Sequence, residues 1–265
     1  MDPWRDILMV ELAEIGYDTF EESTGGLNAY IDSEKFDGAG LAKLLTLRDP
    51  HVTVNWTSLE IADRNWNAEW EGSFQPVEVD NDVRIRADFH EPVPGFTHEL
   101  VITPQMAFGT GHHATTRMMV RAMLKLDLKN KTVCDLGCGT GVLAILAERM
   151  GASEVIGIDI DMQAVTNASD NVKRNDCVRI SVEKGDTGSL SGRSFDVILA
   201  NIERNTLHAA MPLMFDALRP NGVLLLSGFV SADQEMLAQR ALETGFMLEE
   251  RMNEGDWTLL GCTKP

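Results

Sequence analysis

The sequence predicts an α/β protein with a doubly wound, Rossmann-like parallel sheet, preceded by a smaller α+β domain. Two observations predict the sheet. Apolar runs of strand length alternate with amphipathic, helix-length segments from residue 99 to the C-terminus, which is typical of a parallel sheet with both faces covered. A glycine-rich turn also joins one apolar run directly to a helical pattern. The first 60 residues lack this alternation, so we expect them to form a separate unit.

The larger domain is expected to cover residues 99–265. Its predicted strands are 99–103, 132–136, 154–159, 178–184, 195–200, 222–227 and 257–263. Its predicted helices are 115–126, 142–150, 162–175, 205–218 and 233–244. An extended segment, 247–252, precedes the last strand through a turn at 253–255. The last strand is therefore expected to insert antiparallel at the edge of the sheet.

The small N-terminal domain is expected to cover residues 1–62. A helix begins at Asp2-Pro3, a capping residue followed by proline, and ends at Gly16. Strands at 27–31 and 51–61 flank a helix at 36–47. The order α-β-α-β predicts a small α+β, ferredoxin-like unit that lacks a leading strand.

Residues 63–98 are expected to link the two domains. Trp66 and Trp70 lie four residues apart, so they share a helix face that we expect to pack in a core. Two strands are expected at 74–79 and 83–87, joined by a turn at Asp80-Asn81-Asp82. A Pro- and Gly-containing loop follows.

Composition narrows the function. The net charge is −18, and the acidic excess is larger in residues 1–98 than in the rest. Nucleic acid is therefore not expected as a direct partner, because phosphate binding needs Lys and Arg. A basic protein partner fits the charge, and solubility alone is the alternative. No apolar run approaches the roughly 18 residues of a membrane span, and no signal peptide pattern is present. We therefore expect a cytoplasmic protein without membrane contact.

The centre of the larger domain is the segment Val133–Gly141, which reads VCDLGCGTG. An apolar run ends in Gly137, Gly139 and Gly141, and a helix begins at Val142. Glycine lets the turn adopt positive φ and lets its backbone approach a ligand closely. This strand–turn–helix arrangement predicts a nucleotide-type binding site.

An acidic residue completes that pattern. Asp159 ends the next apolar run, 22 residues after Gly137, where a carboxylate can accept hydrogen bonds from a ribose. A dinucleotide fingerprint would place its third glycine at Val142, and no P-loop Lys-Ser/Thr follows. The site therefore suits an adenosine cofactor without phosphates, and S-adenosylmethionine is the candidate.

Two more side chains stand at predicted strand ends, where open α/β sheets bind ligands. Asn201 follows the apolar run 195–200, and its amide can hold a donor amine or the amino-acid part of the cofactor. Asp186 follows the strand 178–184. It is expected either to accept from the adenine amino group or simply to cap a turn.

A second glycine loop, Met106–Thr116, carries two adjacent histidines. His112 and His113 are expected to be hydrogen-bonding structural residues, with a base, a substrate contact or a metal ligand as alternatives. No third ligand candidate accompanies them, and the four cysteines show no paired spacing, so no metal is expected. Thr115 or Thr116 is expected to cap the following helix.

The chain resembles the bacterial ribosomal protein L-11 methyltransferases, which have the class I methyltransferase fold. The resemblance runs from about residue 60 to 230. The matching segments are Asn65–Trp70, Ala107–Thr116, Asp135–Gly141, Gly157–Asp161 and Asp196–Ile202. The Phe-Gly-Thr-Gly loop followed by Ala-Asn-Ile is the specific part, because the glycine and acidic motifs occur in most class I methyltransferases. His112 and Ala114 depart from the Thr and Pro that are usual in the loop.

The resemblance implies that the N-terminal domain recognises the ribosomal protein and that residues 99–265 bind S-adenosylmethionine and catalyse transfer. It implies methylation of the N-terminal α-amine and of lysines of ribosomal protein L-11. The expected catalytic residue is Asn201. The expected cofactor-binding residues are Phe108, Thr116, Gly137, Gly139, Asp159, Asp186 and Asn201.

The sequence leaves three other functions as alternatives. One is a methyltransferase for another protein or a small-molecule amine. An adenine-N6 nucleic-acid methyltransferase is disfavoured because Ile202-Glu203, rather than Pro-Pro-aromatic, follows Asn201. A non-catalytic, cofactor-binding assembly factor would not need an intact Gly137, Asp159 and Asn201.

Overall fold

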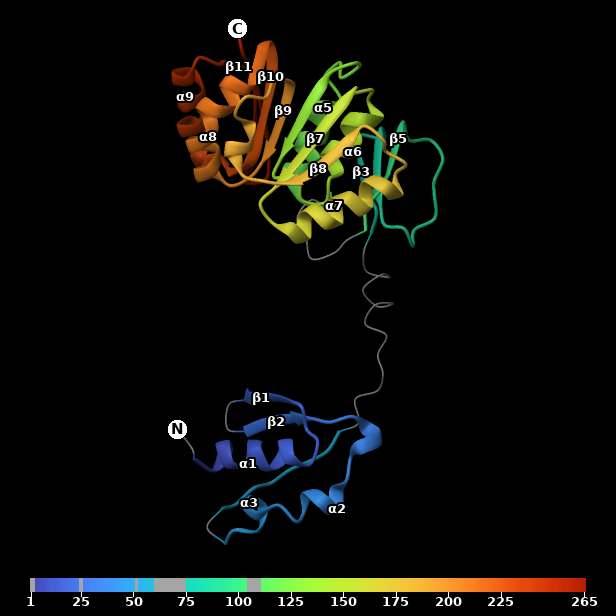
Figure 1. Ribbon diagram of the computed structural model, residues 1–265, viewed down its shortest axis with the longest axis vertical. Helices are drawn as coiled ribbons and strands as arrows, with labels where there is room; N and C mark the ends of the chain where they lie inside the picture. Colours follow the sequence, from blue (N-terminus) through green and yellow to red (C-terminus); the bar gives the residue numbers. More distant parts are fainter. Residues whose placement is uncertain (1–2, 24–25, 51, 60–74, 104–110) are drawn as a thin grey trace. The chain divides into compact units, whose positions relative to one another are not determined.

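The computed structural model describes most of the chain (Figure 1). The described ranges are 3–23, 26–50, 52–59, 75–103 and 111–265. The contacts divide the chain into two compact units, residues 1–68 and 69–265. The predicted tryptophan helix near residues 63–71 and Phe108 lie outside the described residues. None of the described helices is long and apolar enough to cross a membrane.

The first unit is built from short elements. They are α1 (Pro3–Glu14), β1 (Thr19–Ser23), β2 (Gly26–Tyr30), a 3-10 turn (Ser33–Lys35), α2 (Gly38–Leu41) and α3 (Leu45–Arg48). Strands β1 and β2 form an antiparallel hairpin. The core of this unit contains Leu12, Tyr17, Leu41 and Leu44. Its secondary structure is therefore α+β, as predicted.

Two details of that unit correct the sequence prediction. The single helix expected at 36–47 is two short helices, because the chain turns between Ala42 and Leu44. Residues 52–59 are neither helix nor strand, so the strand expected at 51–61 is wrong for the described part. The partner of β2 is instead β1, at 19–23, whose Thr-Phe-Glu-Glu-Ser sequence gave no clear strand signal. The order α-β-α-β is therefore wrong for the described residues.

A three-stranded sheet opens the second unit. Strand β3 (Val77–Val79) pairs antiparallel with β4 (Val83–Arg86), and β4 pairs parallel with β5 (His98–Val101). The turn predicted between β3 and β4 is confirmed, with φ +51° at Asp80 and +61° at Asn81. The strand expected at 99–103 belongs to this small sheet rather than to the large one, which corrects the prediction. The buried side chains of β3 and β4 lie in the same core as helices of the second unit.

The large sheet has seven strands, in the order β11-β12-β10-β9-β6-β7-β8. The parallel strands are β6 (Thr132–Leu136), β7 (Glu154–Asp159), β8 (Ile180–Lys184), β9 (Phe195–Asn201) and β10 (Leu218–Val230), and β8 forms one edge of the sheet. The connecting helices are α5 (Ala114–Met123), α6 (Val142–Arg149), α7 (Met162–Arg174), α8 (Arg204–Ala217) and α9 (Gln234–Thr244). The predicted alternation over residues 132–244 is confirmed.

The last two strands correct one prediction. Strand β12 (Trp257–Thr263) is antiparallel, as expected, but it lies between β10 and β11. The edge strand is β11 (Met247–Glu254). Burial explains the order: residues 258–262 are all buried, whereas β11 alternates exposed and half-buried residues. A strand buried on both faces belongs inside a sheet, and an alternating polar strand suits its edge.

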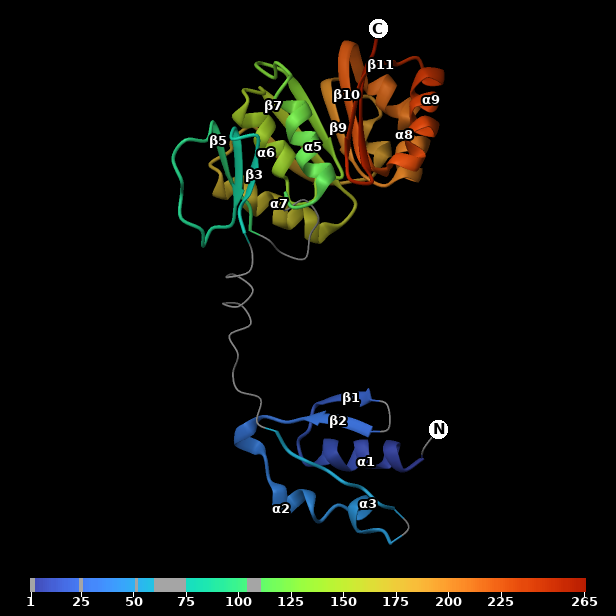
Figure 2. The same ribbon diagram turned by 180° about the vertical axis from the view of Figure 1, so that it is seen from behind.

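Helices cover both faces of the large sheet. Alternate residues of each strand belong to two cores: Val133 lies with α5 and α6, and Cys134 with α8 and α9. The same alternation separates Leu259 from Leu260. Figures 1 and 2 show α8 and α9 grouped on the side of β10 to β12. The doubly wound, Rossmann-like prediction is therefore confirmed.

Candidate active site

The site is set by a reversal of strand order at the centre of the sheet. Strand β6 has β7 on one side and β9 on the other, and all three are parallel. The connections after β6 and β9 therefore leave at the same edge of the sheet, which is where open α/β sheets bind ligands. This edge holds Gly137, directly after β6, and Asn201, the last residue of β9.

The glycine turn is tied to the end of β7. The N–H groups of Gly137 and Cys138 donate to the carbonyl of Ile158 over 2.7 and 3.0 Å. Gly137, Gly139 and Gly141 have φ of +73°, +54° and +78°, a region that side chains strongly disfavour. The glycines are therefore required by the backbone itself.

Ile202 joins the turn to the end of β9. A Cβ on Gly137 would lie 2.1 Å from Ile202 Cγ2, and a Cβ on Gly228 would lie 2.3 Å from the Ile202 carbonyl oxygen. Gly228, at φ +95° in β10, was missed by the sequence reasoning, because nothing local distinguishes it from other strand glycines. Both glycines let the segment after Asn201 lie close to the turn. The structure thus places two predicted site residues, Gly137 and Asn201, on either side of Ile202.

Asp159 also belongs to this group. Its Oδ2 accepts from the Gly139 N–H over 2.9 Å, and its Oδ1 accepts from the Asp161 N–H over 3.0 Å. Each carboxylate oxygen retains a second lone pair for a further donor. Asp159 therefore fixes the glycine turn while still offering acceptors at the sheet edge.

Asp135 lies beneath the turn and was not singled out in the sequence. It is 1% exposed, and its Oδ2 accepts from the Ala144 N–H over 3.0 Å. Its Oδ1 has no hydrogen-bond partner among the described residues. Burial raises the pKa of Asp135 to about 7, the Ala144 N–H opposes this, and the charge of Asp159 adds to it. This buried polar atom next to the turn is available to a polar ligand.

The remaining predicted cofactor residues have different surroundings. Thr116 is buried in the first turn of α5. Asn201 is half-buried, and its side chain has no hydrogen bond within the described part of the chain. Asp186 is exposed and accepts from the Gly188 N–H over 2.9 Å, so it caps a turn. Its contact with adenine stays a prediction.

Comparison with known proteins decides the family. The model of the family "Ribosomal protein L11 methyltransferase (PrmA)" matches residues 9–265. The chain belongs to this family. The ribosomal protein L11 methyltransferase of Porphyromonas gingivalis is 41% identical over 97% of this chain and 90% of its own length. That of Phocaeicola vulgatus is 40% identical over 96% of this chain and 91% of its own length.

Solved structures agree with the family assignment. A ribosomal protein L11 methylase from Lactobacillus delbrueckii subsp. bulgaricus is similar, with a TM-score of 0.67 and 27% identity, over 72% of this chain and all of that one. A Pyrococcus furiosus methyltransferase shares the fold, with a TM-score of 0.53. The resemblance and the class I methyltransferase fold predicted from the sequence are confirmed.

The two histidines of this family member have structural contacts. His112 Nε2 lies 2.9 Å from the Gln75 carbonyl, and the His112 carbonyl accepts from Arg117. His113 caps α5, and its Nδ1 lies 2.7 Å from Thr115 Oγ1. The capping residue is therefore His113 rather than Thr115 or Thr116, which corrects the prediction. The described residues contain no group of three metal-ligating side chains.

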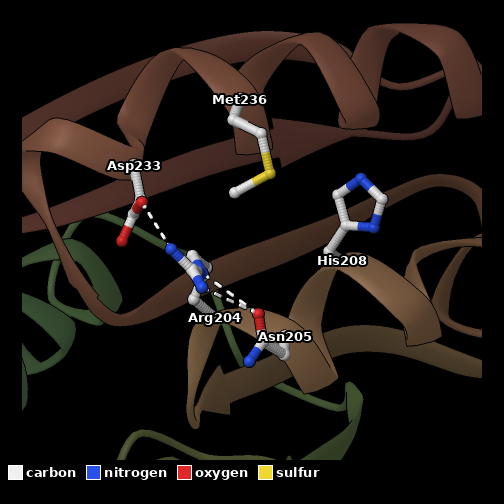
Figure 3. A pocket seen from close by; sticks show the side chains of 5 residues that line it. All are labelled: Arg204, Asn205, His208, Asp233 and Met236. Atoms are coloured by element: carbon white, nitrogen blue, oxygen red, sulfur yellow. Dashed lines mark hydrogen bonds and ion pairs between the residues drawn. The ribbon is translucent and has the colours of Figure 1, made fainter.

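A pocket of about 540 Å³ opens near the same edge of the sheet, between the beginnings of α8 and α9 (Figure 3). Its lining residues are Arg204, Asn205, His208, Asp233 and Met236. Arg204 donates to Asp233 Oδ1 over 2.9 Å and to Asn205 Oδ1 over 3.0 and 3.1 Å. The guanidinium is therefore engaged in joining the two helices.

The raised pKa of Asp135 predicts how stability depends on pH. The folded protein holds a proton on Asp135 up to about pH 7, whereas the ordinary pKa is 3.8. The contribution of Asp135 to the free energy of unfolding is therefore fully present below about pH 4, and it is lost as the pH rises through about 7. Relative to wild type, Asp135→Asn should gain stability over this range, by a few kcal/mol at most. Chemical unfolding at pH 5, 6, 7 and 8 measures the difference.

Asp196 provides a control of opposite sign. Burial favours its neutral form, but bonds from Thr132 and the charge of Arg219 outweigh this and hold the pKa of Asp196 below its ordinary value. Its stabilisation is present above that value and is lost in acid, so Asp196→Asn should show no change in relative stability between pH 6 and 8. A constant difference between Asp135→Asn and wild type from pH 5 to 8 would contradict the assignment for Asp135.

Proposed function

We propose that this chain transfers methyl groups from S-adenosylmethionine to amino groups of ribosomal protein L11, the N-terminal α-amine and lysines. The observation that carries the proposal is the family match over residues 9–265. The site supports it, since the glycine turn, Asp159 and Asn201 gather at one edge of the sheet. The methylated amines were expected from the sequence resemblance.

The residues present fit S-adenosylmethionine. The positive φ of Gly137 and Gly139 shapes a turn whose backbone can lie close to the methionine and ribose parts, and Asp159 offers acceptors to ribose hydroxyls. Asp135 Oδ1 is a buried polar atom without a hydrogen-bond partner among the described residues. Ile160, which follows Asp159, is 72% exposed and can cover an adenine ring. Phe108, Thr116 and Asp186 complete the proposed set. When bound, the cofactor supplies an electrophilic methyl group on its sulfonium.

The protein's own task is to present an uncharged amine. Deprotonation at pH 7 costs roughly 4–5 kcal/mol for a lysine and about 1 kcal/mol for an α-amine. Desolvation at the sheet edge lowers both costs. The Asn201 amide oxygen can accept an N–H of the amine and so orient its lone pair, because the amide has no competing bond within the described residues. His112 and His113 are engaged in structural contacts, so we propose that the amine loses its proton before it binds.

Mass spectrometry tests the proposal directly. Purified L11 is incubated with the protein and S-adenosylmethionine, and added methyl groups are located by peptide mapping. We expect 14 Da increments at the N-terminal amine and at lysines. Methylation of another ribosomal protein, with L11 unmodified, would contradict the assignment of L11 as the substrate. Cofactor binding without turnover on any ribosomal protein would favour the assembly-factor alternative.

The two units suggest a division of labour. We propose that residues 1–62 recognise the substrate and that 99–265 bind the cofactor. The segment 63–98 links them, and its strands β3 and β4 also pack in the core of the second unit. The first unit has its own core, around Leu12 and Leu41, and carries many acidic side chains. An acidic surface suits a basic protein. We therefore propose a cytoplasmic enzyme that contacts the ribosomal protein rather than nucleic acid.

A shortened chain that begins near residue 63 tests this division. It should bind S-adenosylmethionine with nearly full affinity, because Gly137, Asp159 and Asn201 are all retained. It should methylate intact L11 poorly, with the loss mainly in KM, by roughly tenfold or more for a lost protein contact. Steady-state kinetics on L11 and calorimetric titration of the cofactor measure both. Equal efficiency on L11 would show that the first unit is not the recognition domain.

A further inference from the structure

One face of α7 presents three asparagines four residues apart. Asn167, Asn171 and Asn175 are 1%, 0% and 2% exposed. A side-chain amide buried this deeply needs hydrogen-bond partners, because a buried polar group without one costs free energy. Two of them bond β5 and the residues that follow it, and one of those two also bonds the glycine turn. In Figures 1 and 2, α7 lies beside the small sheet that contains β5.

Outside its own helix, the side chain of Asn175 bonds β5. Its Oδ1 accepts from the Val101 N–H over 2.9 Å, and its Nδ2 donates to the Val101 carbonyl over 2.7 Å. The same Nδ2 donates to the Asn171 carbonyl within α7. This amide replaces a missing neighbour strand at the edge of the small sheet. It has no bond to the glycine turn.

Asn171 joins two separate segments. Its Oδ1 accepts from the Thr103 N–H over 3.0 Å, just after β5. Its Nδ2 donates to the Thr140 carbonyl over 3.0 Å and to Asn167 Oδ1 over 2.9 Å. The bond to Thr140 reaches the glycine turn one residue after the Gly139 N–H that donates to Asp159. The turn is therefore held by a carboxylate at Gly139 and by an amide at Thr140.

We propose that Asn171 is a positioning residue for the cofactor turn. Thr140 lies between two glycines of positive φ, whose backbones are the least restricted by side chains, so the conformation of the turn depends on its hydrogen bonds. A fixed Thr140 carbonyl sets the orientation of the peptide plane that joins Thr140 to Gly141. A Cβ on Gly141 would lie 3.2 Å from Ala168 Cβ, so α7 also packs closely here. This inference rests on the proposed binding of S-adenosylmethionine at the turn.

The consequence is specific to binding. If the turn is held ready before the cofactor arrives, loss of the restraint weakens binding without altering the reacting groups. Asn171→Asp keeps the acceptor for Thr103 but removes both donors. We expect roughly five- to tenfold weaker S-adenosylmethionine binding, the range for losing a neutral hydrogen bond. KM for the cofactor should rise by the same factor, with kcat at saturation within about twofold.

Asn175→Asp is the matched control. It keeps the acceptor for Val101, removes two donors and buries the same new carboxyl on the same helix face. Both variants should lower Tm to a similar extent, but Asn175→Asp should leave cofactor affinity within about twofold. Calorimetric titration and thermal unfolding of the full chain give both quantities. The alanine pair, Asn171→Ala and Asn175→Ala, decides the result if a buried aspartate prevents folding.

The outcomes separate the two proposals. Wild-type protein that binds S-adenosylmethionine, with equal affinity in the Asn171 and Asn175 variants, overturns the positioning role and leaves the proposed function intact. Wild-type protein that does not bind the cofactor overturns both. Weaker binding confined to the Asn171 variants supports the positioning role. If both asparagines only stabilised the fold, the Asn171 and Asn175 variants would change cofactor affinity alike.

Discussion

Replacement of Asn201 by alanine should lower turnover about 100- to 1,000-fold with the fold intact, the range for a lost polar contact to the reacting groups. Asn201 ends β9 at the sheet edge next to Gly137, and its side chain has no structural bond within the described residues to lose. Its amide is therefore available for the substrate amine or for the amino-acid end of the cofactor. Single-turnover methylation of L11 measures the change.

Asn205→Ala is the matched control for this prediction. Asn205 is exposed on α8 four residues later, and its Oδ1 accepts from Arg204. Its loss should leave turnover within about threefold, as expected for a surface substitution. Cofactor titration distinguishes contact with the substrate amine from contact with the cofactor. Unchanged cofactor affinity with lost turnover would show that the Asn201 amide contacts the amine. Near-normal turnover in Asn201→Ala would remove Asn201 from the site.

Asp159→Ala should weaken S-adenosylmethionine binding by about 1.5–3 kcal/mol, or roughly 10- to 150-fold, for lost bonds to a charged acceptor. The structure adds a second reason for the loss. Asp159 also accepts from the Gly139 and Asp161 N–H groups, so its removal releases the glycine turn. Calorimetric titration gives the affinity directly.

Asp161→Ala controls for loss of local stability. Asp161 caps α7 by accepting from the Gln163 N–H, so its loss should cost about 1 kcal/mol of stability. Cofactor affinity should change much less than in Asp159→Ala. Unchanged affinity in Asp159→Ala would reject the ribose assignment, and tighter binding of NAD or ATP to wild-type protein would reject the cofactor itself.

Local pattern was sufficient to predict the large sheet. The apolar runs and helical periodicities from residue 132 to 244 match the observed strands and helices closely, because each segment has one or two faces buried against the same core. The glycine turn was predictable for a related reason. Its three positive-φ glycines are a requirement of the backbone, so they appear in the sequence itself.

The N-terminal unit and the sheet to which β5 belongs were less predictable. The elements of that unit after α1 are short and partly exposed, so neither periodicity nor composition identifies them securely. Strand β5 has the sequence of any sheet strand, and only its pairing with β4 assigns it to the small sheet. The order of β11 and β12 likewise follows from burial on one face or on two, which is a property of the assembled sheet.

The sequence by itself determined the fold class, the family and the residues of the glycine turn, because these depend on motifs and on periodicities within single segments. Only the tertiary structure decided what holds the turn. Ile202 and Gly228 beside it and Asn171 on α7 come from segments far apart in the chain, and the bond of Asp135 to the Ala144 N–H is visible only in the fold. The physical reason is that buried hydrogen bonds and close backbone contacts join residues without any spacing rule between them.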